Sequence, residues 1–402
     1  MTSSSRFQLY CFITLCGAYG LIGSPTPDAP DWKELLIAIA LLGSIGISGI
    51  AFVMGLSQQK GIEVKKARFM RLFLYYGISV PLVVAVFRGG EPALITRDVI
   101  GFLFLLLPLF LFPLIHSNKR VKDAAFYKIC LYSALFIGMC FAVRVIWPAL
   151  SNTTELLYLA NFPLVILTAI YCMGQVLALG GLRFSLRQAA PLMGYVLLTA
   201  LVVIAMLQDV QRAPMAALGL SLIVLILDQF IKAPKKAIVS VFILTSSIIF
   251  LWPYWHEVLL AITYKTSIVG LNMRAQELAA VWQVLSQSPT HFLFGAGWGG
   301  QFESPAVGNL SVTFTHSLLS YMALKTGFFG IVLTLIYMGV ISYHGAGVFF
   351  RDRVVGIALL WAFIIPIFLY ASYKSLDFGL LLTLILALSL YNEKQRPLEV
   401  TQ

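Results

Sequence analysis

Apolar runs of about 17 to 25 residues recur along the whole chain, separated by charged or proline-rich breaks. A helix of about 20 apolar residues can cross the hydrocarbon core of a bilayer. Only helices and closed barrels satisfy their backbone polar groups inside lipid, and these runs lack the period-two alternation of barrel strands. Charged residues make up 11% of the chain, against about 25% in soluble domains. The sequence therefore predicts an all-α integral membrane protein.

The runs divide the chain into about twelve transmembrane helices, which we expect to form a single polytopic membrane domain over residues 1–402. The approximate bounds are 7–23, 34–56, 72–87, 99–115, 129–147, 162–180, 190–207, 215–231, 237–253, 315–343, 355–371 and 378–391.

Most of the 28 lysines and arginines fall on one side of the membrane if the amino terminus is cytoplasmic. Positively charged loops mark the cytoplasmic side, so we expect both termini there. The net charge of +11 is thereby explained as a topology signal, and no nucleic-acid partner is expected. The five cysteines all lie within apolar runs, without the spacing of a zinc site or a disulfide framework.

One connection, residues 254–314 between spans nine and ten, is far longer than the others. Its tryptophans and phenylalanines predict a folded, partly helical cap on the outer face. The stretch 272–288 has helical periodicity, with Arg274 four residues before Leu278 and in line with its apolar face. An arginine so placed either binds an anionic partner or extends its side chain to the lipid headgroups.

Three further residues at the outer boundary are candidates for chemistry. Arg212 lies in the very short loop 208–214, where it either anchors the loop at the interface or offers a planar fork to a diphosphate. His316 opens span ten, either as a general base or as a helix cap. Asp377, in the loop 372–377, is either a functional carboxylate or a solvated loop residue.

Charged residues within the spans are also functional candidates by position, among them Arg144, Asp228 and Lys325. The outer face carries no clustered carboxylates and no metal-binding motif, so we expect no metal and no cofactor.

His316 and Ser317 are followed after nine residues by Gly327 and, after two more, by Gly330. With the long outer loop before it, this pattern resembles the O-antigen ligase and polymerase superfamily. The resemblance covers roughly residues 195–340. It includes Arg212 after span seven, Arg274 in the loop helix, and the later Phe-Gly-Ala-Gly-Trp-Gly stretch at 294–299.

The resemblance implies a GT-C-like glycosyltransferase of the bacterial inner membrane, working without metal on the periplasmic face. Its donor is a glycan on undecaprenyl diphosphate, and its acceptor is a lipid A core in ligases or the growing glycan in polymerases. His316 is then the base for the acceptor hydroxyl, Arg212 and Arg274 contact the donor diphosphate, and Asp377 is a supporting carboxylate.

The family often has glycine after the first arginine, where this chain has Ala213. The outer loop is also short for a ligase, so O-antigen ligase is the first expectation and polymerase the alternative. A lipid or solute transporter is a more distant alternative, since many twelve-span proteins are transporters. Repeated halves, which transporters often show, are not visible in the sequence.

Overall fold

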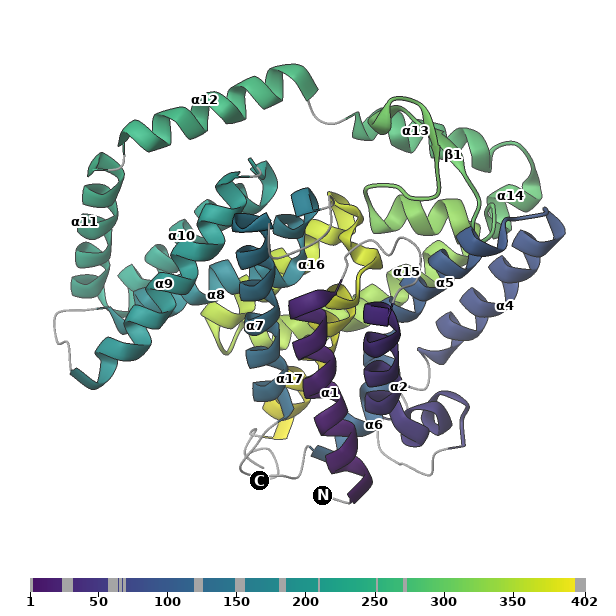
Figure 1. Cartoon of the computed structure of the whole chain (residues 1–402), viewed down its shortest axis with the longest axis horizontal. Coiled ribbons are helices and arrows are strands. Elements are labelled where there is room, and N and C mark those ends of the chain that lie inside the picture. Colours follow the sequence, from purple (N-terminus) through teal and green to yellow (C-terminus); the bar gives the residue numbers. More distant parts are fainter. Residues whose placement is uncertain are drawn as a thin grey trace, which may run out of the picture.

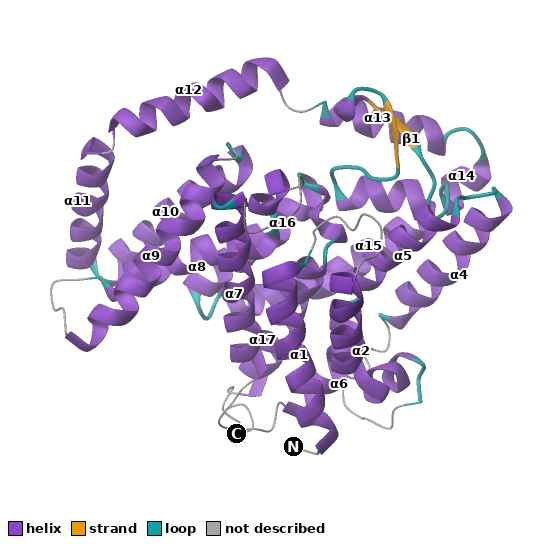
Figure 2. Cartoon of the chain, viewed as in Figure 1, coloured by secondary structure: helices purple, strands orange, loops and turns teal. Residues whose placement is uncertain are grey.

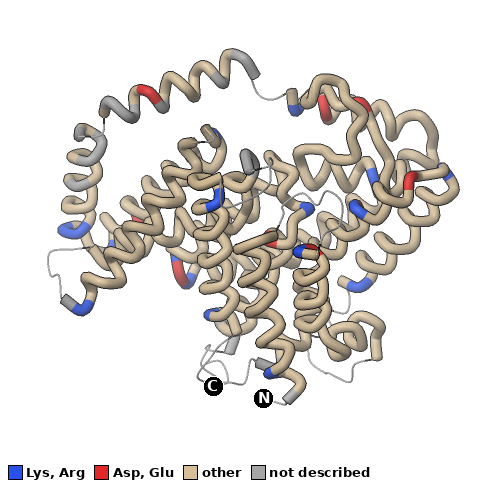
Figure 3. The backbone as a smooth tube through the Cα atoms, viewed as in Figure 1, with Lys and Arg blue, Asp and Glu red and all other residues tan. Residues whose placement is uncertain are grey.

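The computed structural model describes residues 3–23, 32–56, 64, 67, 70–118, 126–148, 156–180, 186–208, 210–250, 252–269 and 273–394. Nearly all of this part of the chain is helical, apart from one small hairpin (Figure 2). The long helices are almost free of charged residues along their lengths (Figure 3). The predicted all-α class is confirmed.

Every predicted span falls on one or two described helices. In chain order the first nine spans correspond to α1 (Ser3–Ile22), α2 (Trp32–Val53), α4 (Arg71–Phe87), the pair α5 (Pro92–Leu105) and α6 (Leu107–Asn118), α7 (Phe126–Ile146), α8 (Pro163–Leu179), α9 (Leu186–Gln208), α10 (Arg212–Lys232) and α11 (Pro234–Phe250). The last three correspond to α15 (Leu318–Phe349), α16 (Arg353–Phe368) and α17 (Leu376–Lys394).

Six helical segments of the described chain are long and apolar enough to cross a membrane: α2, α5 with α6, α7, α9, α10 and α15. Four shorter helices, α4, α8, α16 and most of α17, are also apolar. The protein is therefore a multi-pass membrane protein.

The first residues of α1 and the last turn of α17 lie at the same end of the bundle, at the bottom of Figure 1. The segment between α11 and α15 lies at the opposite end, at the top of the view. Several of the basic residues used to predict orientation, in 57–63, 65–66, 68–69, 119–125, 181–185 and 395–402, lie outside the described residues.

The predicted outer loop is mostly regular structure. It contains α12 (Trp252–Val269), α13 (Arg274–Leu285), α14 (Pro289–Phe294) and an antiparallel hairpin of β1 (Phe302–Ser304) and β2 (Leu310–Val312). Helix α12 extends across the top of the molecule in Figure 1. Helix α13 packs on α15, where Val281 and Leu285 join Phe302, Ala323 and Leu324 in a small apolar core.

Two glycines let α14 and the segment after it approach α15 closely. Helix α15 is kinked at Gly327, which has a φ of 64°, and a Cβ there would lie 2.4 Å from the backbone nitrogen of Gly295. Gly295 has a φ of 75° and faces the same backbone. Only glycine fits where two backbones meet in this way. The two glycines therefore let the backbone after α14 pack directly against α15.

Candidate functional site

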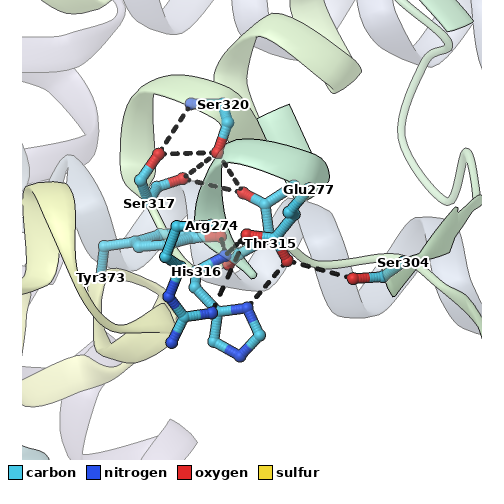
Figure 4. A network of polar contacts seen from close by, with 8 residues as sticks. All are labelled: Arg274, Glu277, Ser304, Thr315, His316, Ser317, Ser320 and Tyr373. Carbon is cyan, nitrogen blue, oxygen red and sulfur yellow. Dashed lines mark hydrogen bonds and ion pairs between the residues drawn. The ribbon is translucent and has the colours of Figure 1, made fainter. Parts of the chain in front are cut away.

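The backbone around His316 is fixed by a set of hydrogen bonds just before α15 (Figure 4). The Tyr373 hydroxyl donates to the carbonyl of Thr315 at 2.8 Å. The Ser317 side chain accepts from the backbone N–H of Ser320 at 3.1 Å and so caps α15. Ser320 in turn donates to the Thr315 hydroxyl at 2.8 Å. Because Thr315 is fully buried, this segment has little freedom to move.

Glu277 orients the imidazole of His316. Its Oε1 lies 2.8 Å from the ring Nδ1, and its Oε2 accepts the backbone N–H of His316 at 3.1 Å. Ser304 donates to Oε1 at 3.2 Å. An ionised carboxylate only accepts hydrogen bonds, so we assign the ring proton to Nδ1, which leaves the Nε2 lone pair available. The His316 side chain is 18% exposed, so the ring can be reached from outside.

The environment keeps Glu277 ionised. Burial disfavours its charge and raises its pKa, but the hydrogen bonds from His316 and the positive charge of Arg274 oppose burial. The net effect is a pKa below that of an ordinary glutamate. A charged carboxylate behind the ring stabilises the imidazolium that forms when His316 takes up a proton.

Arg274, the first residue of α13, lies beside this pair. Its Nη1 is 4.0 Å from Oε2 of Glu277, and this nitrogen is buried without a hydrogen-bond partner among the described residues. Burial lowers the pKa of Arg274. The negative charges of Glu277 and Tyr370 act in the opposite direction, and the positive charge of Arg212 lowers the pKa further. Arginine remains charged even so. Arg274 is therefore a cation with a hydrogen-bond donor that is not in use.

Arg212, the first residue of α10, is bound to α12. Its Nη1 donates to the Thr266 hydroxyl of α12 at 3.0 Å. Burial raises the pKa of Tyr370, and the charges of Arg274 and Arg212 both oppose that rise. The two arginines thus act on each other and on one phenol. Arg274 and His316 come together at Glu277, from α13 and the segment before α15, while the hydrogen bond of Arg212 goes to α12.

Asp377 does not belong to this group. It lies in the first turn of α17 and is fully buried, so the alternative of a solvated loop residue was wrong. Its carboxylate accepts from Ser375, from the Tyr19 hydroxyl at 3.5 Å and from the backbone N–H of Leu164 at 3.5 Å. These contacts tie α17 to α1 and α8. No contact among the described residues joins Asp377 to His316, Arg212 or Arg274, so the structure places it apart from the other candidates, and its supporting role stays a prediction.

The glycine-rich segment after α14 is a packed connection in which most backbone donors are already used. The N–H groups of Ala296, Gly297 and Trp298 donate to carbonyls of α15 and α4, and that of Gly299 donates to Asp98 at 2.9 Å. A phosphate would have to compete with these acceptors. The segment packs against α15, α4 and α5 and offers no anion cradle.

A buried ionic cluster holds this segment in place. Asp98 of α5 lies 2.7 Å from the Nζ of Lys325 and 3.0 Å from that of Lys374, and Lys325 and Asp98 are fully buried. Lys325 also donates to the carbonyl of Gly300. The intramembrane lysine singled out in the sequence is thus paired, and its partner Asp98 was missed.

Glu277 was the other omission. Its spacing of three residues from Arg274 places both on one helical face, and this signal was present in the sequence.

No group of three or more His, Cys, Asp or Glu side chains able to hold a metal ion occurs among the described residues. Neither a scan against protein-family models nor a search of curated proteins finds a match to this chain.

Proposed function

We propose that the protein is an O-antigen ligase, a metal-independent inverting glycosyltransferase of the bacterial inner membrane. It transfers a glycan from undecaprenyl diphosphate to a hydroxyl of the lipid A core on the periplasmic face. The observation that carries the proposal is the buried Glu277 behind His316, with the cation of Arg274 beside the pair. A base and an anion site are the two parts that such a transfer needs.

The chemistry follows from these groups. The acceptor hydroxyl attacks the anomeric carbon of the donor sugar, and the bond from that carbon to the diphosphate oxygen breaks. The diphosphate leaves with the electron pair, while His316 Nε2 takes the hydroxyl proton. Attack opposite to the leaving group inverts the anomeric centre in one displacement.

The arginines stabilise the leaving group. A diphosphate departs readily when its developing charge is neutralised, and guanidinium groups match pairs of its oxygens. The buried Nη1 of Arg274 has no hydrogen-bond partner among the described residues, so a bound phosphate oxygen would satisfy it. Arg212 would give up or share its contact with Thr266 to reach the same group.

The proposal includes a membrane arrangement. About twelve spans in a GT-C-like bundle put both termini in the cytoplasm and the segment 254–314 in the periplasm. The common end shared by the start of α1 and the end of α17, opposite α12 and α13, supports it. A site on that face can meet both a lipid-linked donor and a lipid-linked acceptor.

A polymerase using the same donor is the second candidate, because the outer segment is short for a ligase and the same base and arginines would serve. It differs from the ligase only in the acceptor, which is the growing undecaprenyl-linked glycan.

The test is transfer by purified protein from a synthetic undecaprenyl diphosphate oligosaccharide, in parallel reactions with and without lipid A core. Product that forms only with the core supports the ligase. Longer undecaprenyl-linked chains without the core support the polymerase. A lack of glycosidic product in both reactions, together with uptake of the donor into sealed vesicles, would contradict both and favour a transporter.

A further inference from the structure

A continuous strip of exposed aromatic side chains connects the cap to the membrane-spanning bundle. The Trp282 ring of α13 lies 6.2 Å from that of Phe292 in α14, and Phe292 stacks on Phe328 of α15 at 5.8 Å. Phe329 lies next to Phe328, with ring centroids 5.9 Å apart. All four are exposed, from 40% for Phe292 to 58% for Trp282. Large apolar side chains arranged in this way indicate a covered surface.

The lower end of the strip identifies what covers it. Helix α15 is apolar and long enough to cross the membrane, and the described residues 318–327 of that helix are buried or nearly so. After the kink at Gly327 its outer side is exposed, beginning with Phe328 and Phe329 and continuing through Val332, Leu335 and Ile336. In a spanning helix such a side faces lipid. The strip is therefore continuous with a lipid-facing surface.

The exposed residues of α13 lie on two different sides of the helix. At about 100° per residue, Leu278 and Trp282 lie on one flank of the buried line Glu277, Val281 and Leu285. The exposed glutamines Gln276 and Gln283 lie on the side of the helix opposite to that line, about 100° or more from Trp282. The apolar residues of this helix are therefore divided. Val281 and Leu285 lie in the core, and Leu278 and Trp282 lie outside it. The side with Leu278 and Trp282 can contact lipid, and the side with the glutamines can contact water.

The exposed surface of α13 and α14 carries no charged side chain. Among the exposed residues of α13 and α14 there is no lysine, arginine, aspartate or glutamate, since Arg274 is half-buried and Glu277 is buried. Helices that lie in the plane of a membrane bury one apolar flank at the headgroup boundary, and tryptophan is enriched at that depth.

We infer that α13 and α14 lie in the headgroup layer of the bilayer, with Leu278, Trp282 and Phe292 inserted among the lipids. The partner of this surface is the membrane itself. The cap that carries Arg274 and Glu277 is therefore anchored at the level where lipid-linked phosphates lie. The inference concerns the position of the cap and holds whatever group the site transfers.

The test places a nitroxide label on each of four exposed positions of the same helix, by Leu278→Cys, Trp282→Cys, Gln276→Cys and Gln283→Cys. The background carries Cys11→Ser, because the other four native cysteines are buried. Each protein is reconstituted into phosphatidylethanolamine and phosphatidylglycerol vesicles. Collisions with oxygen, which concentrates in lipid, are compared with collisions with a water-soluble nickel complex. The glutamine positions are the matched controls.

The expected result is a preference for oxygen at positions 278 and 282 and for nickel at positions 276 and 283. All four positions lie on the surface, so labelling does not require repacking of the core. Nickel preference at all four positions would put α13 above the membrane, and oxygen preference at all four would put it within the hydrocarbon. Either result overturns the inference.

Discussion

The ring Nδ1 of His316 lies 2.8 Å from Oε1 of Glu277, although 39 residues separate the two along the chain. The other oxygen of the same carboxylate holds the backbone N–H of His316 at 3.1 Å. One buried side chain therefore sets both the position of the main chain and the direction of the imidazole. This pairing favours a base over a helix cap as the role of His316, since it is Ser317 that caps α15.

Glu277→Gln should slow glycosyl transfer by roughly 10²-fold, because a neutral amide neither fixes the Nδ1–H tautomer nor stabilises an imidazolium. The measurement is the transfer rate at saturating donor and acceptor. Glu303→Gln on the exposed side of β1 is the control and should leave the rate unchanged. Equal rates for wild type and Glu277→Gln would remove Glu277 from the mechanism.

Arg274→Lys and Arg212→Lys should each weaken donor binding by about tenfold, because an ammonium keeps the charge but loses the fork that grips two phosphate oxygens. The measurement is the KM for the undecaprenyl diphosphate donor, with the KM for the acceptor as internal reference. Arg6→Lys, on the exposed side of α1 near its start, serves as the control. A donor KM that stays constant in both variants would argue against a diphosphate clamp.

Asp98→Asn should lower the free energy of unfolding by about 3–5 kcal/mol, because it leaves two lysines beside a neutral side chain in a buried setting. The thermal unfolding midpoint in detergent reports this change. Adding Lys325→Met to Asp98→Asn should recover part of the loss, since it removes one unpaired charge.

The comparison for Asp98 is Asp228→Asn, which breaks the partly exposed pair with Lys232. Such pairs contribute about 1 kcal/mol or less. Equal midpoints for the two asparagine variants would show that the Asp98 cluster does not hold the fold.

Gly327→Ala should destabilise the protein by roughly 1–2 kcal/mol or more, because alanine disfavours a φ of 64° and its Cβ would meet the backbone of Gly295. Gly339→Ala, in the same helix, should be neutral or stabilising, since a Cβ there has no neighbour within 4 Å. Matching melting temperatures for the two variants would contradict the close packing at the kink.

Hydropathy predicted most of the fold because a spanning helix needs a long apolar run, and that property can be read without knowing its neighbours. It did not predict α12, which was included in a loop although it forms a continuous helix from Trp252. It also placed the start of span ten at residue 315, whereas α15 begins at Leu318. Ends depend on caps and packing, which a hydropathy pattern does not contain.

The site was predicted in part. Position at the outer boundary singled out His316, Arg212 and Arg274, and the structure joins His316 and Arg274 through Glu277. Glu277 was missed because its role depends on a contact across 39 residues. The burial of Asp377 was not predicted because burial of a loop carboxylate depends on tertiary packing. When two polar residues pair inside a helical bundle, the sequence around one of them does not identify the other.

The most direct test of the account is a single-turnover reaction of purified wild type and His316→Ala with a synthetic undecaprenyl diphosphate oligosaccharide, its acceptor and EDTA. The account predicts an inverted glycosidic product from wild type and a rate lower by about 10²–10⁴-fold in His316→Ala at an unchanged melting temperature. A wild-type reaction that stops in EDTA, or a His316→Ala variant that transfers at the wild-type rate, would contradict it.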